Sequence, residues 1–549
     1  MSSKTLFLSS ALLAAACFPA CAQPPAAEVR TASAASSQDA SGSSLKGFFA
    51  KGVDAVLKVL RRPASNASAM KVLYPFDQTI FPKDIRSPEF RWEGPVPPGG
   101  AWTIRVSFKN SGYTVGDSSG KPRWTPSAAV WDDIRARSLE NPAVFEVAAA
   151  PDGKPGSAAS VTFTTSRDPV GAPIFFRAVP GGPEFPLEKD YVKVKWKLGW
   201  VSSYAPPIVV MRNQTTCFNC HAASADGKTF GFDYNSSEED MSSYLLFREK
   251  GKTVNFLPRH VMDWNDYKRG NNVHPYQANA SAISPDGKVV VTAGRALSMV
   301  APKAKDIIQY ALPMRGIILY RTFDDPTIRA LPGGDDESFV HYASSWSPDG
   351  KYIYYFGSPI TPQLDQLGRD KLAGVKKDDK RRLGWRDFDK LYPIRYDVYR
   401  IPFAGGKGGR PEKIAGASAN GRSNYFPRAS PDGKWLVYAQ SANGATLVRE
   451  DSDLYIVPAA GGTARKLRSN GPRADSWHSW SPNGRWLAFA SKSYGQQTDI
   501  VLTHIDAAGA DSPPIVLTQM RDEGGLAANL PEFFNIKPGQ LEEIIPRLR

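Results

Sequence analysis

The sequence predicts an all-β fold: an N-terminal β-sandwich of immunoglobulin or fibronectin type, followed by a β-propeller of six blades. Two observations support this prediction. Before residue 195, short segments such as 102–108 alternate large apolar with polar side chains, as half-buried strands do. Beyond residue 195, a five-residue turn recurs, and a β-rich run follows each copy. Such a repeat is typical of blades arranged around an axis.

Residues 1–22 have the pattern of an export signal. A lysine opens the segment, residues 6–16 are apolar, and residues 20–22 form a small-residue cleavage site. A second cleavage point lies before Cys17, where the sequence loosely resembles a bacterial lipoprotein box. That cut would leave Cys21 as an unpaired thiol in an oxidising compartment. We therefore expect a soluble periplasmic protein, and a lipid anchor through Cys17 stays open as the alternative.

Residues 23–69 are rich in Ala, Ser and Pro, and we expect a disordered tether. Within it, residues 45–62 can form a helix with one apolar face, made by Phe49, Val53, Val56, Leu57 and Leu60. Such a helix would contact a membrane surface or dock on the protein itself. No later apolar run is long enough to span a bilayer, so we expect no transmembrane segment in the mature chain.

Residues 70–195 are expected to form the β-sandwich. The alternation at 102–108 recurs at 161–164, and turns rich in Pro and Gly separate the runs. Trp92, Phe145 and Phe175 supply apolar bulk. These aromatic residues are expected to form a core rather than a ligand platform.

Residues 196–549 carry the repeat. Its sequence is Ser-Pro-Asp-Gly-Lys or a close variant, with proline, then Asp or Asn, then Gly as in a type I turn. The copies begin at Ser224, Ser284, Ser347, Ser430 and Ser481. The run 530–535 resembles a further inner strand, and strands before Cys217, such as 191–198, would complete a sixth blade and close the ring.

One motif in this chain predicts a cofactor-binding site. Residues 217–221 read Cys-Phe-Asn-Cys-His, which is the attachment pattern of a c-type haem. Two thiols at this spacing can bond to the two vinyl groups of one porphyrin, and the adjacent imidazole then binds the iron. Cys217, Cys220 and His221 are therefore the predicted cofactor-binding residues, with His221 as the proximal iron ligand. The predicted cofactor is one covalent haem c.

A zinc site and a redox dithiol are the alternatives for the same five residues. A structural zinc site normally needs a second pair of ligands, and the only other cysteines are Cys17 and Cys21. A thioredoxin-like dithiol would start a helix after a strand, whereas this segment leads into the β-repeat. The haem interpretation is therefore favoured.

The turns, and strands such as 397–402 and 453–458, resemble the repeats of TolB-like propeller proteins. The region from Asp168 to the C-terminus resembles exported bacterial TolB-like proteins that carry one Cys-x-x-Cys-His motif before the first blade. Segments 221–228, 476–486, 502–506 and 530–533 carry this resemblance. It covers about two thirds of the chain, and it implies an architecture more than an activity.

Alignment of the blades on their turns gives the haem motif a place in the repeat. Three residues before the turn serine stand His221, Ser281, Ser344, Pro427 and His478. The iron is therefore predicted at one mouth of the propeller channel. His478 is the first candidate for the distal iron ligand, because it shares the repeat position of His221.

Weaker candidates for the distal ligand are His341 and His274, which precede their turns by six and ten residues and are expected in looser loops. Methionine is another common sixth ligand of haem c, so Met211, Met262 and Met314 stay open. For each histidine, the alternative is a channel-lining side chain bonded to backbone.

The formal net charge is +14, with 68 basic residues spread among 54 acidic ones. Export and the lack of clustering argue against nucleic acid as a partner, and a partner with an acidic docking surface, or an anionic membrane, fits better. A charged run at 376–382 would be a docking arm or a solvated loop.

Three functions stay open at this point. The favoured one is an exported monohaem cytochrome that exchanges electrons with a redox partner in the cell envelope. The second is a haem-dependent oxidoreductase with its active site at the propeller mouth, and the third is a binding scaffold with a structural haem. The sequence contains no hydrolase elbow, zincin helix or phosphate-binding loop.

Overall fold

The computed structural model describes residues 70–547, apart from internal gaps. These gaps are residues 98, 150–157, 181–191, 215, 217, 236–241, 249–250, 271–275, 302–309, 373–389, 391–392 and 445–448. The predicted export signal, the tether with its helix at 45–62, the charged run 376–382 and the site residues Cys217 and His274 therefore lie outside the described residues. Strands dominate the described chain, as predicted.

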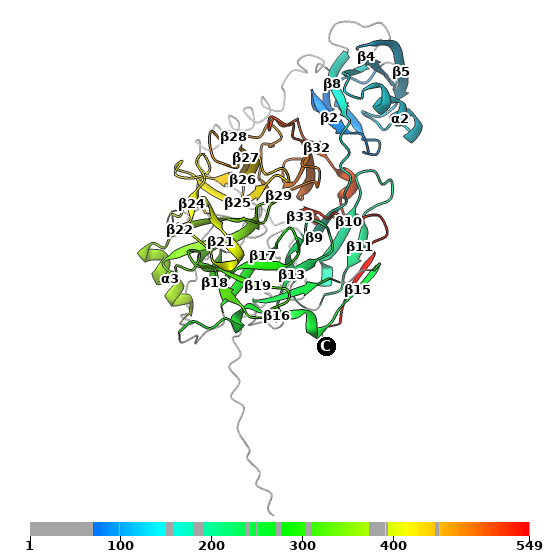
Figure 1. Cartoon of the computed structure of the whole chain (residues 1–549). Coiled ribbons are helices and arrows are strands. Elements are labelled where there is room, and N and C mark those ends of the chain that lie inside the picture. Colours follow the sequence, from blue (N-terminus) through cyan, green and yellow to red (C-terminus); the bar gives the residue numbers. More distant parts are fainter. Residues whose placement is uncertain are drawn as a thin grey trace, which may run out of the picture. The chain divides into compact units, whose positions relative to one another are not determined.

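Two sheets and one helix make up the region before residue 167 (Figure 1). One sheet has the strand order β1-β3-β6, and the other has the order β2-β8-β7-β4-β5. The elements are β1 (Lys71–Tyr74), β2 (Thr79–Pro82), β3 (Phe90–Glu93), β4 (Trp102–Phe108), β5 (Ser111–Ser119), β6 (Arg123–Trp124), α2 (Ala128–Arg137), β7 (Ala143–Ala148) and β8 (Ala158–Ser166).

The apolar faces of these two sheets pack against each other. The ring centroid of Phe145 in β7 lies 4.7 Å from that of Phe90 in β3 and 6.2 Å from that of Trp124 in β6. In β4, every second side chain is buried, as the alternation at 102–108 predicted. The aromatic residues are therefore core residues of a two-layer sandwich.

The helix α2 was not predicted. Ser127 caps its N-terminus by accepting a hydrogen bond from the backbone N–H of Val130, and the helix buries Trp131 and Ile134. In addition, β2 pairs with β8 in parallel. The immunoglobulin or fibronectin type of this domain stays a prediction.

The described residues after 173 form a β-propeller of six blades with four strands each; four of the blades are separate sheets, and the second and third together form one eight-stranded sheet. A single parallel pair, Gly316 with Val340, links the second and third blades. The first three blades are β12 (Phe218–Ala223), β13 (Phe230–Tyr234), β14 (Ser243–Phe247) and β16 (Val261–Asp263); β17 (Gln277–Ile283), β18 (Val289–Ala301), β19 (Tyr310–Thr322) and β20 (Arg329–Ala330); and β21 (Phe339–Trp346), β22 (Tyr352–Pro359), β23 (Asp397–Pro402) and β24 (Glu412–Lys413).

The other three blades repeat this pattern. They are β25 (Ser423–Ala429), β26 (Trp435–Ser441), β27 (Asp453–Pro458) and β28 (Arg465–Lys466); β29 (Asp475–Trp480), β30 (Trp486–Ser491), β31 (Asp499–His504) and β32 (Ile515–Val516); and β33 (Ala527–Phe533), β9 (Ile174–Val179), β10 (Lys195–Gly199) and β11 (Ile208–Met211). The innermost strands β17, β21, β25, β29 and β33 gather around a common centre (Figure 1).

The last blade closes the ring with strands from distant parts of the chain. Its innermost strand β33 pairs with β9, and β9 pairs with β10. The predicted closure is confirmed. The predicted boundary at 195/196 placed residues 174–179 in the sandwich, whereas their hydrogen bonds place them in this blade. All six residues of β9 are buried, because both faces of a blade are covered, so the alternation expected of a half-buried strand is missing.

The repeated turns have the predicted structure. In the turn at 284–287, the Ser284 hydroxyl donates a hydrogen bond to Asp286 at 2.6 Å and accepts one from the backbone N–H of Val289. The turn glycine has φ +69°, a left-handed conformation that favours glycine. The same serine-to-Asp or serine-to-Asn bond recurs in the turns that begin at Ser224, Ser347, Ser430 and Ser481.

A few elements lie outside the blades. Helix α3 (Pro362–Leu372) follows β22, and the strand β15 (Thr253–Phe256) pairs in parallel with the C-terminal strand β34 (Glu543–Pro546). Short 3-10 helices lie at 258–260, 264–266, 404–406 and 518–520. No helix among the described residues is long and apolar enough to cross a membrane.

Candidate haem-attachment site

Cys220 and His221 lie in β12, the innermost strand of the first blade. The pairing of β12 with β13 shifts register between Phe218 and His221. Similar shifts occur in the other innermost strands, and there a non-glycine residue adopts positive φ: Ala280, Ala343, Phe426, Trp477 and Leu530. The residue after each of them occupies the repeat position of His221. A bulge of this kind re-aims the following side chain.

Side chains at this repeat position contact the preceding blade. The Ser281 hydroxyl donates to Asp233 in β13 at 2.7 Å, and His478 Nε2 lies 2.9 Å from the carbonyl oxygen of Val437 in β26. His221 likewise packs against β9 and β10 of the last blade. His221 and His478 therefore lie at different interfaces between blades, although they share a repeat position.

Aromatic rings surround His221, which is 2% exposed. The nearest ring centroids, at 4.9 Å, belong to Phe175 and Trp196, and those of Phe534 and Phe232 follow at 5.8 and 6.2 Å. Neither imidazole nitrogen makes a hydrogen bond of acceptable geometry among the described residues. An unsatisfied buried nitrogen costs about 1–3 kcal/mol, so a bonding partner for this ring is expected.

The pKa of His221 is lowered well below its usual range. Burial is the largest cause, and the positive charges of Arg177 and Arg428 act in the same direction. An interaction with the backbone of Phe175 raises the pKa of His221, but this is the smallest of the contributions. The imidazole is therefore neutral at physiological pH, which is the form that binds a metal ion.

Cys220 is a free thiol, 7% exposed, and it packs with side chains of the other innermost strands, such as Ala343 in β21 and Leu530 in β33. Burial raises the pKa of this thiol, and the carboxylate of Asp233 raises it further. Asp233 itself accepts hydrogen bonds from the backbone N–H of Ala280 and the hydroxyl of Ser281, both at 2.7 Å. Burial nevertheless raises the pKa of Asp233 to about 7.

Two arginines flank the motif, the buried Arg177 and the partly exposed Arg428. Arg177 in β9 donates to the side-chain oxygen of Asn219 at 2.8 Å and to the backbone oxygen of Phe218 at 3.4 Å. Arg428 in β25 forms an ion pair with Glu532 in β33 at 2.9 Å. Sequence reasoning missed both arginines, as well as Asp233 and Glu532. The only signal was the position of Glu532 within the inner strand predicted at 530–535.

A narrow cavity on the channel side brings several of these residues together. Its lining leaves room for about one water molecule. The lining residues are Cys220, His221, Ala280, Ser281, Ala343, Ser344, Phe426, Arg428 and Trp477. A porphyrin needs far more space than this, so its binding requires the side chains around Cys220 and His221 to move.

His478 and His341, the two histidine candidates that the structure describes, do not converge on His221. His478 bonds to Val437 as described, and His341 Nδ1 lies 3.1 Å from the carbonyl oxygen of Gly316. His341 was predicted in a loose loop, but it is buried in β21, because that strand extends to Phe339. Burial lowers the pKa of His341 to about 4 and that of His478 to about 3. Both therefore have the backbone-bonded role that the sequence left as their alternative.

The three methionine candidates are buried in separate parts of the propeller. Met211 lies in β11 of the last blade, Met262 in β16 of the first and Met314 in β19 of the second. Within the described ranges, no group of three or more His, Cys, Asp or Glu side chains could hold a metal ion.

The donor set fits a c-type haem in its chemistry. Cys220 offers a free thiol, and His221 offers a neutral imidazole whose nitrogens make no hydrogen bond of acceptable geometry within the part of the chain that the structure describes. The aromatic rings around His221 would supply the apolar shell that controls solvent access to such a site. The position of the Cys217 thiol lies outside the described residues.

Comparisons with known proteins show likeness of fold alone. No protein-family model matches the chain, and no curated protein sequence matches it. Among solved structures, TolB from Acinetobacter baumannii is 14% identical with a TM-score of 0.38, covering 72% of this chain and 79% of TolB. Hydrazine synthase from Kuenenia stuttgartiensis is 16% identical with a TM-score of 0.27, covering 52% of this chain and 76% of that one. The propeller assignment rests on the sheet topology, and these likenesses carry no functional argument.

Proposed function

We propose that this chain is an exported monohaem c-type cytochrome that exchanges electrons with a redox protein of the cell envelope. The proposal rests on the sequence context and the burial of His221. It completes a Cys-x-x-Cys-His motif, and its buried, neutral imidazole has no hydrogen-bond partner among the described residues. A buried polar group with no partner is rare in folded proteins, and an iron ligand bond would satisfy one of its nitrogens.

The residues have distinct roles in this proposal. Cys217 and Cys220 would hold the porphyrin through thioether bonds, and His221 would bind the iron. The haem supplies one-electron redox chemistry when bound. Arg177 would hold β12, which carries Cys220 and His221, through its bonds to Phe218 and Asn219. Export rests on the signal pattern at 1–22, with the lipid anchor through Cys17 as its alternative.

The absorption spectrum of the purified protein, oxidised and reduced, tests this function. We expect the bands of one haem c per chain, retained after denaturation and acid–acetone extraction. The double variant Cys217→Ala/Cys220→Ala should lose the covalent haem. If the wild-type protein binds no haem, or the double variant retains it covalently, the proposal fails.

A second function is favoured by the hydrogen bonds of His478 and His341. Each of these imidazoles already bonds to a backbone carbonyl, so neither is poised to bind the iron. A sixth iron position without a protein ligand would support a haem-dependent oxidoreductase that acts on a small oxidant or reductant. A high-spin spectrum of the wild type that changes on addition of cyanide would favour this function, and a low-spin spectrum would favour electron transfer.

A further inference from the structure

A cavity that shares no residue with the haem motif lies where the β-sandwich meets the fifth blade. Its volume is about 280 Å³. Side chains from residues 74–91 and from Thr125 line it on the sandwich side, and side chains from residues 515–521 line it on the propeller side. One water molecule needs far less space, and ligand pockets usually start at about 300 Å³. The cavity therefore has room for a small molecule.

The two sides of this cavity are packed against each other. Trp92 of the sandwich and Ile515 of the fifth blade belong to one buried apolar cluster. The backbone N–H of Ser87 also donates a hydrogen bond to the hydroxyl of Tyr204, in the loop between β10 and β11, at 3.2 Å. The cavity is thus part of a packed interface.

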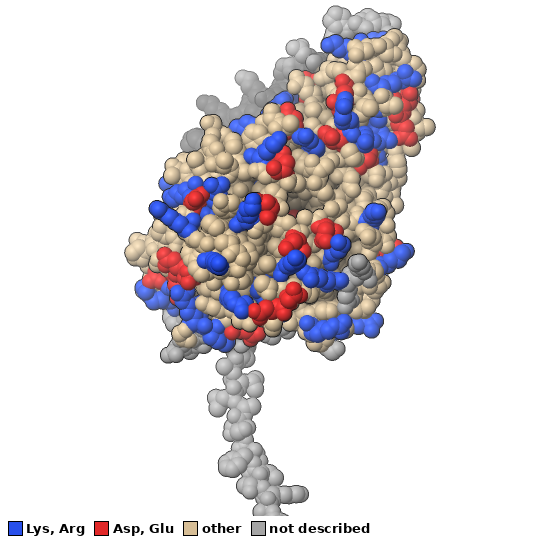
Figure 2. All heavy atoms as spheres, in the orientation of Figure 1, with Lys and Arg blue, Asp and Glu red and all other residues tan. Residues whose placement is uncertain are grey.

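The lining of the cavity carries more positive than negative charge. It includes Arg86, Arg91 and Arg521, with Glu89 as an acidic residue. On the face drawn in Figure 2, in contrast, acidic and basic side chains are interspersed. The guanidinium of Arg521 donates to both carboxylate oxygens of Asp499, at 2.7 and 2.8 Å, so its charge is compensated. The excess positive charge therefore comes from Arg86 and Arg91.

Arg91 in β3 has donors available for a ligand. Its guanidinium carbon lies 5.9 Å from the ring centroid of Tyr74, and its side chain makes no hydrogen bond or ion pair among the described residues. The guanidinium carbon of Arg86 lies 5.4 Å from the ring centroid of Tyr204, and Nη1 donates to the backbone oxygen of Tyr204 at 3.4 Å. Glu89 forms an ion pair with the arginine of β6 at 3.8 Å.

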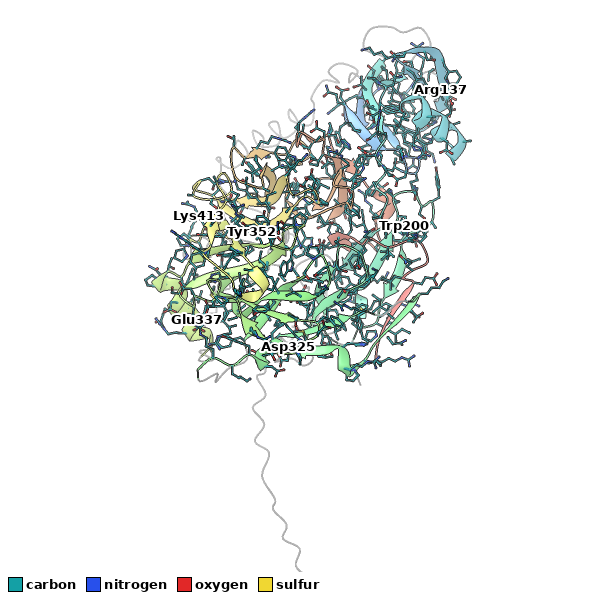
Figure 3. All side chains as sticks on the ribbon, in the orientation of Figure 1. Arg137, Trp200, Asp325, Glu337, Tyr352 and Lys413 are labelled. Atoms are coloured by element: carbon teal, nitrogen blue, oxygen red, sulfur yellow. The ribbon has the colours of Figure 1, made fainter. Side chains whose placement is uncertain are left out.

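Two other donors in the lining also lack partners. Within the described part of the chain, neither the hydroxyl of Tyr74 nor Nε2 of Gln519 makes a hydrogen bond of acceptable geometry. Tyr74 is 4% exposed, and burial raises the pKa of Tyr74, although the charge of Arg91 and the backbone of Val516 act against this shift. The hydroxyl therefore keeps its proton and can donate. Gln519 also lines a neighbouring hollow with Trp200, which Figure 3 labels.

We propose that this cavity binds a small organic carboxylate, which accepts hydrogen bonds from Arg91 and the Tyr74 hydroxyl and is attracted by the charge of Arg86. A guanidinium matches the geometry of a carboxylate, and buried donors without partners are rare in folded proteins. Apolar side chains such as Ile85 and Ile515 would cover the carbon skeleton of the ligand, which inorganic phosphate lacks. This inference goes beyond the proposed function and is independent of haem attachment.

Isothermal titration calorimetry of the full chain at constant ionic strength tests the proposal, with succinate, citrate and inorganic phosphate as probes. We expect succinate or citrate to bind with a Kd of about 1 mM or tighter, and phosphate to bind about tenfold more weakly. Arg91→Met should weaken binding of the carboxylate about tenfold, and Tyr74→Phe about threefold. Arg105→Met is the matched control, because Arg105 pairs with Glu146 on the sandwich and does not line the cavity. It should leave the affinity unchanged.

Three results would overturn the proposal. They are no binding of either carboxylate, binding of phosphate as tight as that of the carboxylates, and equal weakening by Arg91→Met and Arg105→Met. The last result would show a general attraction of anions to a basic protein. If Arg91→Met does not fold, Tyr74→Phe decides, because an unchanged affinity contradicts the proposal. Tyr74→Phe removes an unsatisfied hydroxyl, so the Tm of the ligand-free chain should stay unchanged or rise.

Discussion

His221 and His478 occupy the same position of the repeat, but their imidazoles have different partners. His478 bonds to the carbonyl oxygen of Val437, whereas neither nitrogen of His221 has a partner among the described residues. Both are buried. A buried hydrogen bond stabilises the fold, and an unsatisfied buried group destabilises it. Comparing variants of the two residues can therefore separate a histidine that stabilises the fold from one that binds a ligand.

Replacement of each histidine by phenylalanine should have opposite effects on the haem-free chain. His221→Phe places an apolar ring among aromatic rings and removes two unsatisfied nitrogens, so the free energy of unfolding should stay unchanged or rise. His478→Phe removes the hydrogen bond to the Val437 carbonyl and should lower the free energy of unfolding by about 1–3 kcal/mol. Urea unfolding of the two variants in the Cys217→Ala/Cys220→Ala background measures both. Equal destabilisation by the two substitutions would contradict a special role for His221.

Asp475 gives the fold a pH dependence that is separate from the haem site. It begins β29 and is buried, and burial raises its pKa to about 7, although the backbone N–H of Gly471 donates a hydrogen bond to it at 2.7 Å. The unfolded value is about 3.9. Between these values the folded chain holds a proton that the unfolded chain has released, so this group's contribution to stability is lost as the pH rises.

The variant Asp475→Asn should remove this dependence. Compared with the variant, the wild-type chain should lose stability from about pH 4 to pH 7, by at most about 1.4 kcal/mol per pH unit, and then reach a plateau. Urea unfolding of both proteins across this range gives the difference. A difference that is constant with pH, or that grows in favour of the wild type as the pH rises, would show that the Asp475 carboxyl is ionised in the folded chain.

At the scale of elements, the repeated turn sets the geometry of each blade. Its serine bonds to the Asp or Asn two residues later, and its glycine has φ between +65° and +71°. At Gly350, φ is +70° and a Cβ atom would meet nothing within 4 Å. The cost of a side chain at this position therefore comes from the backbone conformation alone.

Gly350→Ala should lower the free energy of unfolding by about 1–2 kcal/mol, the cost of a left-handed conformation for a residue with a Cβ atom. Gly116 in β5 is the matched control, because a Cβ atom there also meets nothing within 4 Å and its φ is not positive. Gly116→Ala should leave stability unchanged or raise it slightly. Thermal unfolding by circular dichroism compares the two, and equal effects would mean that the turn does not require glycine.

At the scale of the whole molecule, the C-terminal segment closes the propeller. The strand β33 supplies the innermost strand of the blade whose other strands precede the first blade, and Phe534 stacks on Phe175 with ring centroids 4.5 Å apart. The strand β34, in contrast, pairs with β15 outside the blades and adds Ile544 to the apolar cluster that contains Phe175. Closure by distant strands ties the two ends of the repeat region together.

Two truncations should separate these contributions. Removal of residues 527–549 deletes β33 and should abolish the cooperative thermal unfolding of the propeller, because β9 loses its inner partner and the rings around His221 lose Phe534. Removal of residues 541–549 deletes only β34, and the chain should stay folded with a lower midpoint. A cooperative transition in the longer deletion would show that β33 is not needed to close the ring.

The sequence predicted the parts of this molecule that local chemistry determines. The turns recur because serine, Asp and glycine stand at fixed offsets, and the repeat count led to the six blades and their closure. Arg177, Asp233, Arg428 and Glu532 could not be found this way. Arg177, Arg428 and Glu532 lie far from the motif in the chain and come near it through packing between blades, whereas Asp233 lies in β13, the neighbouring strand of the same blade. The shared repeat position does not bring His478 to His221, because their side chains contact different preceding blades. His478 as the distal ligand stays a prediction.

Haem attachment at residues 217–221 is the central claim, and mass spectrometry tests it most directly. Trypsin should release residues 213–228, between Arg212 and Lys228, as one peptide with both cysteines. From protein exported in a host that attaches haem c, we predict that this peptide carries one haem and that neither Cys217 nor Cys220 reacts with iodoacetamide. An unmodified peptide with two alkylated cysteines, or one with a Cys217–Cys220 disulfide, would contradict the claim.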